Sequence, residues 1–160
     1  MLKKLLAIAC MVSISCTFAA KAKKKAPKKE KYTYVQRYIL MDYNSDMIID
    51  ENGKDDRVYP SSMTKLLTLY ILFSKIESGE LALHDTMVVS KKARNTGGSR
   101  SWLLEGSNVS IEDLIRCIIV HSGNDAAVVV AENISGSMEN FAELMNTTAQ
   151  NLGMKNSHFM

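Results

Sequence analysis

The distribution of apolar and polar residues predicts a β-hairpin ahead of a helical region. Two segments rich in β-branched and aromatic residues, 34–43 and 47–50, flank the sequence NSD, whose residue types favour a turn. Asn52-Gly53 and the charged stretch KDDR then predict a loop. We therefore expect two antiparallel strands that are joined by a short turn.

The strongest helical segment covers residues 62–77. Pro60 precedes it, Gly79 follows it as an expected C-cap, and its leucine, methionine and lysine residues favour a helix interior. Apolar residues occupy nearly every face of this segment, which is typical of a buried helix. We therefore expect it to be the central helix of the domain, with Ser62 and Lys65 in its first turn.

The remaining pattern predicts one short strand and three further helices. The segment 125–134 fits a helix or a strand by its pattern, and its alanines favour a helix. The sequence SIED, which begins at Ser110, resembles a capping box, and Ser137 is an expected cap of the last helix. The expected elements are a strand at 86–90, a glycine-rich and serine-rich loop at 94–109, and helices at 110–120, 125–134 and 137–152.

The amino-terminal segment differs from the rest of the chain. Residues 1–20 contain two lysines, about a dozen apolar residues and then small residues, an order that predicts a secretory signal peptide. The alternative is an uncleaved membrane anchor, although residues 5–20 are short for a spanning helix. Residues 21–33 predict a lysine-rich linker with too little apolar content to fold. This pattern predicts export to the periplasm or to the outer face of the cytoplasmic membrane.

Composition and charge limit the functional classes. The chain has 160 residues, of which 46% are hydrophobic and 23% are charged, as in a soluble domain with one core. The net charge is +3, but residues 21–31 alone carry seven lysines and one glutamate. Residues 32–160 carry 16 acidic residues against 11 lysines and arginines, which argues against a nucleic-acid partner. The basic segment 21–31 instead allows contact with anionic envelope polymers or lipid headgroups.

Candidate chemistry begins with Ser62 and Lys65. Residues at positions i and i+3 of a helix lie on one face, so that the hydroxyl and the amine come within hydrogen-bonding reach. Partial burial lowers the pKa of a lysine and allows the amine to act as a base. Alone, this pattern favours an ordinary capped helix start, because serine is a common cap.

A second pair of polar residues strengthens the interpretation. Ser122 and Asn124 form the only Ser-x-Asn sequence in the chain, at the expected junction between two helices. Such a junction can project a hydroxyl and a carboxamide into a cleft. A plain turn that is capped by Asn124 is the structural alternative.

Together these sequences resemble those of the penicillin-binding serine hydrolases, whose signature comprises S-x-x-K, S-x-N and K-T-G. The chain is most similar to the D-alanyl-D-alanine carboxypeptidases among the low-molecular-weight penicillin-binding proteins (serine peptidase family S11). The similarity covers about residues 34–160. It is carried by YPSSMTKLLTLY, GGSRSWLLEGSNVSIEDLIRCIIVHSGNDAAVVVAENISGS and LMNTTAQNLGMKNSHF.

The resemblance implies an α/β fold of the β-lactamase/transpeptidase-like type. Residues 34–160 would be the N-terminal part of the catalytic domain, represented by its helical cluster and first hairpin. No K-T-G follows Ser122, and we expect the strands that complete the sheet to be absent, with the hairpin unsupported and the central helix partly uncovered. Asn95-Thr96-Gly97 precedes Ser122, so residues 94–102 are expected to form a loop at the rim of the active site.

The resemblance also implies a serine-type D-Ala-D-Ala carboxypeptidase acting on peptidoglycan stem peptides through an acyl-enzyme. Ser62 would be the nucleophile, Lys65 the proton acceptor, Ser122 a proton relay and Asn124 a substrate-binding residue. β-Lactams would acylate Ser62. Without K-T-G, one donor of the oxyanion hole and the groups that hold the terminal carboxylate would be missing, so the activity of the chain as given is left open.

Two alternatives remain: a serine β-lactamase of the same fold, and a non-catalytic exported remnant that binds the envelope. No cofactor is expected. No metal is expected either, because the three histidines lack ligand spacing: His84, His121 and His158.

Overall fold

The computed structural model describes residues 37–160, and the chain divides into two units, residues 1–56 and 57–160. The expected signal peptide, the lysine-rich linker and the first residues of the expected hairpin lie outside the described residues. Among residues 37–160, no helix combines the length and the apolar character that crossing a membrane requires.

The described part of the first unit is a β-hairpin. Strands β1 (Tyr38–Met41) and β2 (Ile48–Asn52) pair antiparallel, with Tyr38 opposite Asn52. The Asp42 carboxylate closes the turn, because it accepts hydrogen bonds from the backbone N–H and the hydroxyl of Ser45 at 2.9 and 2.7 Å. These bonds lower the pKa of Asp42. The predicted hairpin is therefore confirmed, with shorter strands than the pattern suggested.

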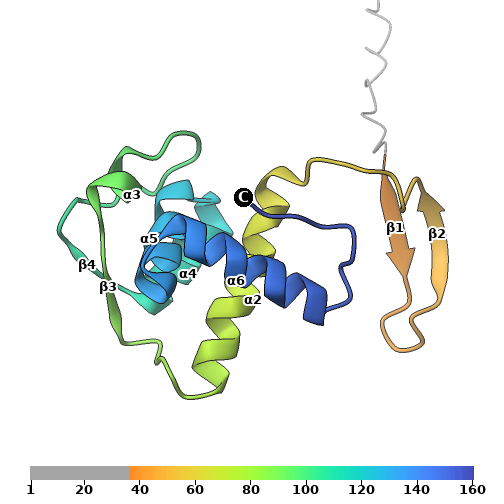
Figure 1. Ribbon diagram of the computed structural model, residues 1–160, viewed down its shortest axis with the longest axis horizontal. Helices are drawn as coiled ribbons and strands as arrows, with labels where there is room; N and C mark the ends of the chain where they lie inside the picture. Colours follow the sequence, from red (N-terminus) through yellow and green to blue (C-terminus); the bar gives the residue numbers. More distant parts are fainter. Residues whose placement is uncertain (1–36) are drawn as a thin grey trace, which may run out of the picture. The chain divides into compact units, whose positions relative to one another are not determined.

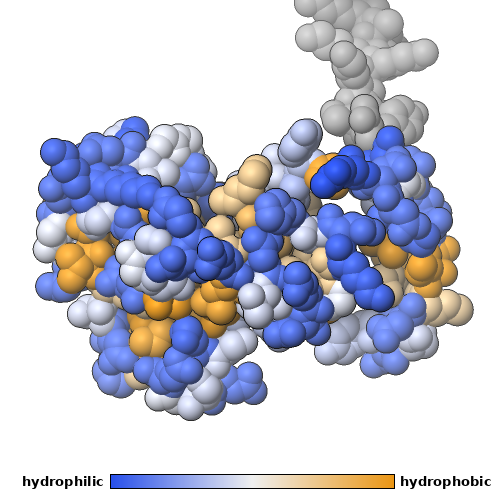
Figure 2. All heavy atoms as spheres, viewed as in Figure 1, coloured by the Kyte–Doolittle hydropathy of each residue, from blue (hydrophilic) through white to orange (hydrophobic). Residues whose placement is uncertain are grey.

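Most side chains of both strands are exposed, including Ile39 at 47% and Leu40 at 53%. Figure 2 shows apolar surface on the hairpin and on the helical unit. Within the ribbon itself, both faces of the two paired strands are therefore largely exposed.

The second unit is a cluster of helices beside a two-stranded ribbon (Figure 1). Strands β3 and β4 pair antiparallel, with Met87 opposite Val109. The elements in chain order are η1 (Ser61–Met63), α2 (Thr64–Glu77), β3 (Thr86–Val88), α3 (Lys91–Asn95), β4 (Asn108–Ser110), α4 (Ile111–His121), α5 (Asn124–Ser135) and α6 (Met138–Asn151).

These elements confirm the predicted strand and all four predicted helices. The expected loop at 94–109 was too long at both ends, since α3 extends to Asn95 and β4 begins at Asn108. The hydroxyl of Ser90 caps α3 by accepting the N–H of Ala93, whose side chain is fully buried. Both elements are too short to produce a recognisable period in the sequence.

The helix at the centre of the unit is α5, and not α2 as the sequence pattern suggested. Helix α5 contacts α2, α3, α4, α6 and β3. Val129 and Val130 are fully buried in one hydrophobic cluster, and Ala131 belongs to a second cluster together with Phe141. Alanine and valine have short side chains, which allow neighbouring helices to approach α5 closely.

Helix α2 buries only part of its surface. Leu67, Ile71 and Leu72 point into the two hydrophobic clusters. On the opposite side Leu66 is 64% exposed and Tyr70 is 47% exposed. The expectation that this helix is partly uncovered is confirmed within the described residues.

Candidate active site

Ser62 lies in the short 3₁₀ turn η1 that leads directly into α2. The turn follows Pro60, whose carbonyl accepts the N–H of Met63 at 3.0 Å. Because η1 and α2 are continuous, Lys65 lies one turn beyond Ser62, and its Nζ is 3.3 Å from the Ser62 Oγ. The predicted proximity of these two side chains is therefore observed, although Ser62 stands just before the α-helix.

Lys65 also reaches a residue far away in the sequence. Its Nζ is 3.3 Å from the Oγ of Ser122, which is 57 positions further along the chain. Lys65 thus bridges the start of α2 and the end of α4. These side chains line a pocket of about 200 Å³, whose lining comprises Ser62, Lys65, Leu66, Leu69, Ile118, Ile119 and Ser122.

The surroundings of Lys65 favour its neutral form. Burial lowers the pKa of the Lys65 ammonium below its usual value of 10.5, because an apolar environment penalises the charge. None of the carboxylates in residues 37–160 forms an ion pair with Lys65 that would oppose this effect. An amine in contact with two hydroxyls and with a lowered pKa can accept a proton from one and pass it to the other.

Ser122 forms the left-handed end of α4. Its φ of 52° and ψ of 37° lie in a region that few residues other than glycine adopt without cost. The N–H of Ser122 still bonds to the carbonyl of Cys117, so the helix ends and the chain turns sharply into α5. This turn directs the Ser122 hydroxyl toward Lys65, as the sequence interpretation of the junction required.

Asn124 occupies a different position from the other three candidates. Its Nδ2 donates to the carbonyl of Gly97 at 2.7 Å, and its N–H donates to the carbonyl of Ser99 at 2.8 Å. Asn124 is the first residue of α5, whose cap is Gly123, so the alternative of Asn124 as a cap is wrong. Asn124 does not line the pocket that contains Ser62, and it ties the rim loop (residues 94–102) to the junction.

The sequence interpretation missed Asp125, which anchors the same loop. Asp125 is 1% exposed, and its carboxylate accepts the backbone N–H groups of Ser101 at 3.0 Å and Leu103 at 3.2 Å. The hydroxyl of Ser99 donates to the carbonyl of Ser122 at 2.6 Å. The rim loop is therefore attached to the junction through several bonds, although the first two residues of the expected loop, 94 and 95, belong to α3. The available signal was an acidic residue in the first turn after S-x-N.

No cluster of three or more histidine, cysteine, aspartate or glutamate side chains that could hold a metal ion occurs within residues 37–160.

Solved structures share this arrangement of elements. The D-alanyl-D-alanine carboxypeptidase DacD from Francisella tularensis superimposes with a TM-score of 0.76 at 40% identity, over 78% of this chain and 30% of that protein. Penicillin-binding protein 5 from Haemophilus influenzae gives a TM-score of 0.74 at 41% identity, over 78% of this chain and 37% of that protein. The fold therefore places the chain in the penicillin-binding, transpeptidase-like class of α/β proteins, as expected.

A family model described as D-alanyl-D-alanine carboxypeptidase (Peptidase_S11) matches residues 22–160, and the chain belongs to this family. The D-alanyl-D-alanine carboxypeptidase DacA of Haemophilus influenzae is 42% identical over 127 residues, which are 78% of this chain. The matched region is 32% of that relative, so this chain spans about a third of its length. The resemblance inferred from the sequence motifs is confirmed at the level of the family.

Proposed function

We propose that this protein is a serine-type D-Ala-D-Ala carboxypeptidase that removes the terminal D-alanine of peptidoglycan stem peptides. The observation that carries the proposal is the position of the Lys65 amine, 3.3 Å from the hydroxyls of both Ser62 and Ser122. Membership of the carboxypeptidase family supports the choice of substrate. About two thirds of the length of these relatives lies outside the region that this chain matches. The carboxypeptidase activity of the whole protein is therefore proposed from the family and from the geometry of the site.

In the acylation step, the Ser62 Oγ attacks the carbonyl carbon of the penultimate D-alanine and neutral Lys65 accepts the hydroxyl proton. A tetrahedral oxyanion forms. The Ser122 hydroxyl donates its proton to the nitrogen of the leaving D-alanine and takes the proton held by Lys65. The C–N bond breaks, D-alanine leaves as a neutral amine, and an ester links the peptide to Ser62.

In the deacylation step, water attacks the ester carbonyl and Lys65 accepts a proton from the water. The Ser62 oxygen then leaves and takes that proton back, which restores the hydroxyl and the neutral amine. A β-lactam would enter the same first step, because its ring amide places a carbonyl carbon and a leaving nitrogen where the peptide has them. The contribution of Asn124 to substrate binding remains a prediction, since its carboxamide is held at Gly97.

Covalent labelling with a fluorescent penicillin tests the proposal in the full-length natural protein. We expect a stable label on the native protein and none on Ser62→Ala. Ser61→Ala is the matched control, because it changes the neighbouring serine of the same turn and should keep the label. Label that persists in Ser62→Ala would refute the assignment. Rapid turnover of a chromogenic cephalosporin would instead favour the β-lactamase alternative.

We further propose that the protein is exported and acts outside the cytoplasmic membrane. The support is the order of residues in the leader, 1–20, which lies outside the described residues. Fractionation of cells that produce the native protein should recover it, shortened at its amino terminus, in the envelope fraction. Recovery in the cytoplasm at full length would contradict export.

A further inference from the structure

We propose that Arg94, Trp102 and Arg100 form an anion-binding subsite, separate from the pocket, that binds a carboxylate of the stem peptide on the amino-terminal side of the scissile bond. This inference rests on the proposed function, since it names a part of the substrate that the protein would recognise. The three residues come from the end of α3 and from the rim loop.

The first observation is that two cationic groups converge on one exposed aromatic ring. The guanidinium carbon of Arg100 lies 4.0 Å from the centroid of the Trp102 ring, and that of Arg94 lies 5.7 Å from it. Trp102 is nevertheless 62% exposed. Tryptophan and arginine are the residues most enriched where binding energy is concentrated, and a stacked guanidinium keeps its edge available for hydrogen bonds.

The second observation is that neither guanidinium has an acidic partner. Most other arginines and several lysines of residues 37–160 form ion pairs; Arg116, for example, pairs with Glu112 and Asp113 of its own helix. The guanidinium groups of Arg94 and Arg100 form no ion pair and donate no hydrogen bond within these described residues. The Nε of Arg100 is buried and lacks any acceptor there. A buried donor without an acceptor is unfavourable, and nothing within the described residues compensates this group.

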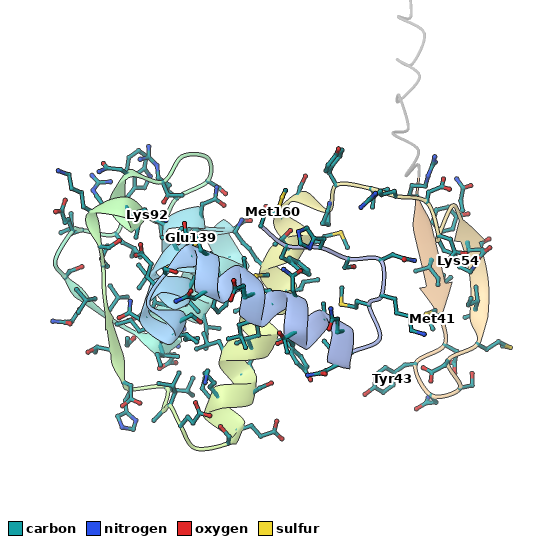
Figure 3. The ribbon with its side chains drawn as sticks, in the orientation of Figure 1. Met41, Tyr43, Lys54, Lys92, Glu139 and Met160 are labelled. Atoms are coloured by element: carbon teal, nitrogen blue, oxygen red, sulfur yellow. The ribbon has the colours of Figure 1, made fainter. Side chains whose placement is uncertain are left out.

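The local charge points to the same class of ligand. Residues 91–100 contain four lysines and arginines and no acidic residue, whereas residues 32–160 as a whole carry 16 acidic against 11 basic side chains. Of the two lysines in this stretch, Lys92 is already paired with Glu139 at 3.6 Å, as their positions on α3 and α6 in Figure 3 show. Guanidinium groups are donors only, so a ligand that satisfies both must present acceptors and negative charge.

The backbone fixes this cluster beside the pocket wall. Ser99 and Ser101, the neighbours of Arg100, both bond to the junction: Ser99 Oγ donates to the Ser122 carbonyl, and Ser101 N–H donates to Asp125. Trp102 has a φ of 60°, which is rare for a bulky residue and is held by the bonds on either side of it. These bonds hold the loop, with its two unpaired arginines, against Ser122, which lines the pocket that contains Ser62.

The relevant carboxylate is the α-carboxylate of the D-glutamate in the stem peptide, a group that exists in free and in amidated forms. Guanidinium groups bind the free form through charge-assisted hydrogen bonds, and the neutral amide loses this attraction. The subsite would thus distinguish the two forms of the peptide.

Trp102 provides the readout, since it is the one tryptophan of this sequence. The chain with Ser62→Ala, which cannot be acylated, is titrated with the pentapeptide L-Ala-γ-D-Glu-L-Lys-D-Ala-D-Ala and with its α-amidated form, and the tryptophan emission is followed. We expect the free carboxylate to bind about tenfold more tightly, with the preference falling as salt is added. Equal affinities, or no change in emission with either peptide, would overturn the proposal.

Variants then locate the preference. Arg94→Gln with Arg100→Gln should bind both peptides equally, and Arg94→Gln alone should reduce the preference. Arg116→Gln is the matched control and should keep it. Penicillin labelling at Ser62, measured in the same variants with Ser62 restored, shows whether the site is intact. A preference that survives the double substitution refutes the subsite. If the native protein is not labelled by penicillin at all, the proposed function is refuted, and the comparison of the two peptides still decides whether the subsite exists.

Discussion

Asp125 should determine the stability of the rim loop more than any exposed acidic residue of the unit. Its carboxylate is 1% exposed and accepts the backbone N–H groups of Ser101, Leu103 and Ala126. All three partners are donors, and the carboxylate lies in the first turn of α5, where the helix dipole favours a negative charge. We therefore predict that Asp125→Asn is destabilising even though the two side chains have nearly the same shape.

The magnitude follows from the number of bonds. An asparagine keeps one acceptor oxygen and presents an N–H₂ group to a donor, so at least one backbone N–H loses its partner inside the protein. Leaving such a group unsatisfied costs about 1–3 kcal/mol. Asp125→Ala removes every acceptor and strands two N–H groups of the loop, for which we expect about 3–5 kcal/mol.

Urea unfolding of the full-length natural protein measures these losses. Asp113→Asn is the control, because Asp113 occupies the first turn of the neighbouring helix α4 but its side chain is 61% exposed. We expect a loss below about 1 kcal/mol for that variant. If Asp125→Asn is no more destabilising than Asp113→Asn, the bonds from the buried carboxylate do not hold the loop. We also expect slower penicillin acylation in Asp125→Asn, since Ser122 depends on the same loop.

Two further predictions concern Lys65 and Ser122. Burial lowers the pKa of Lys65, so the neutral base accumulates as the pH rises, and the rate of penicillin acylation should increase with pH with a midpoint below the usual 10.5. A midpoint at or above 10.5 would contradict this, and Lys65→Arg should show no rise. Ser122→Gly should raise the free energy of unfolding by up to about 1 kcal/mol, because the φ of 52° suits glycine, while acylation falls about 100-fold with the lost hydroxyl. Ser122→Ala should lose acylation without the gain in stability, and equal stabilities of the two variants would refute the strain.

The contact between Ser62 and Lys65 could be predicted from the sequence because it depends on local geometry alone. A spacing of three residues in a helical segment places two side chains on one face, whatever the rest of the fold does. The hairpin and the helix starts at Ser110 and Ser137 were predictable for the same reason, since turn and cap chemistry acts within a few residues.

The contact between Lys65 and Ser122 could not be derived from the sequence by local rules. It depends on a non-glycine residue that adopts a left-handed conformation at the end of α4, which propensity predicts against. It also depends on α5 being the central helix, whereas the sequence pattern predicted the segment of α2 in that position. Only the resemblance of the S-x-N sequence to a known family joined Ser122 to Lys65.

The conformation of Ser122 has a physical explanation in the rim loop. A left-handed residue other than glycine costs about 1–2 kcal/mol. The bond from the Ser99 hydroxyl to the Ser122 carbonyl at 2.6 Å and the bond from the Asn124 N–H to the Ser99 carbonyl at 2.8 Å form across this same turn. Each such bond contributes about 0.5–1.5 kcal/mol, so together they are large enough to offset the strain. The position of the Ser122 hydroxyl is therefore a property of the loop as much as of the helix, and substitutions at Ser99 should change acylation without contacting the peptide.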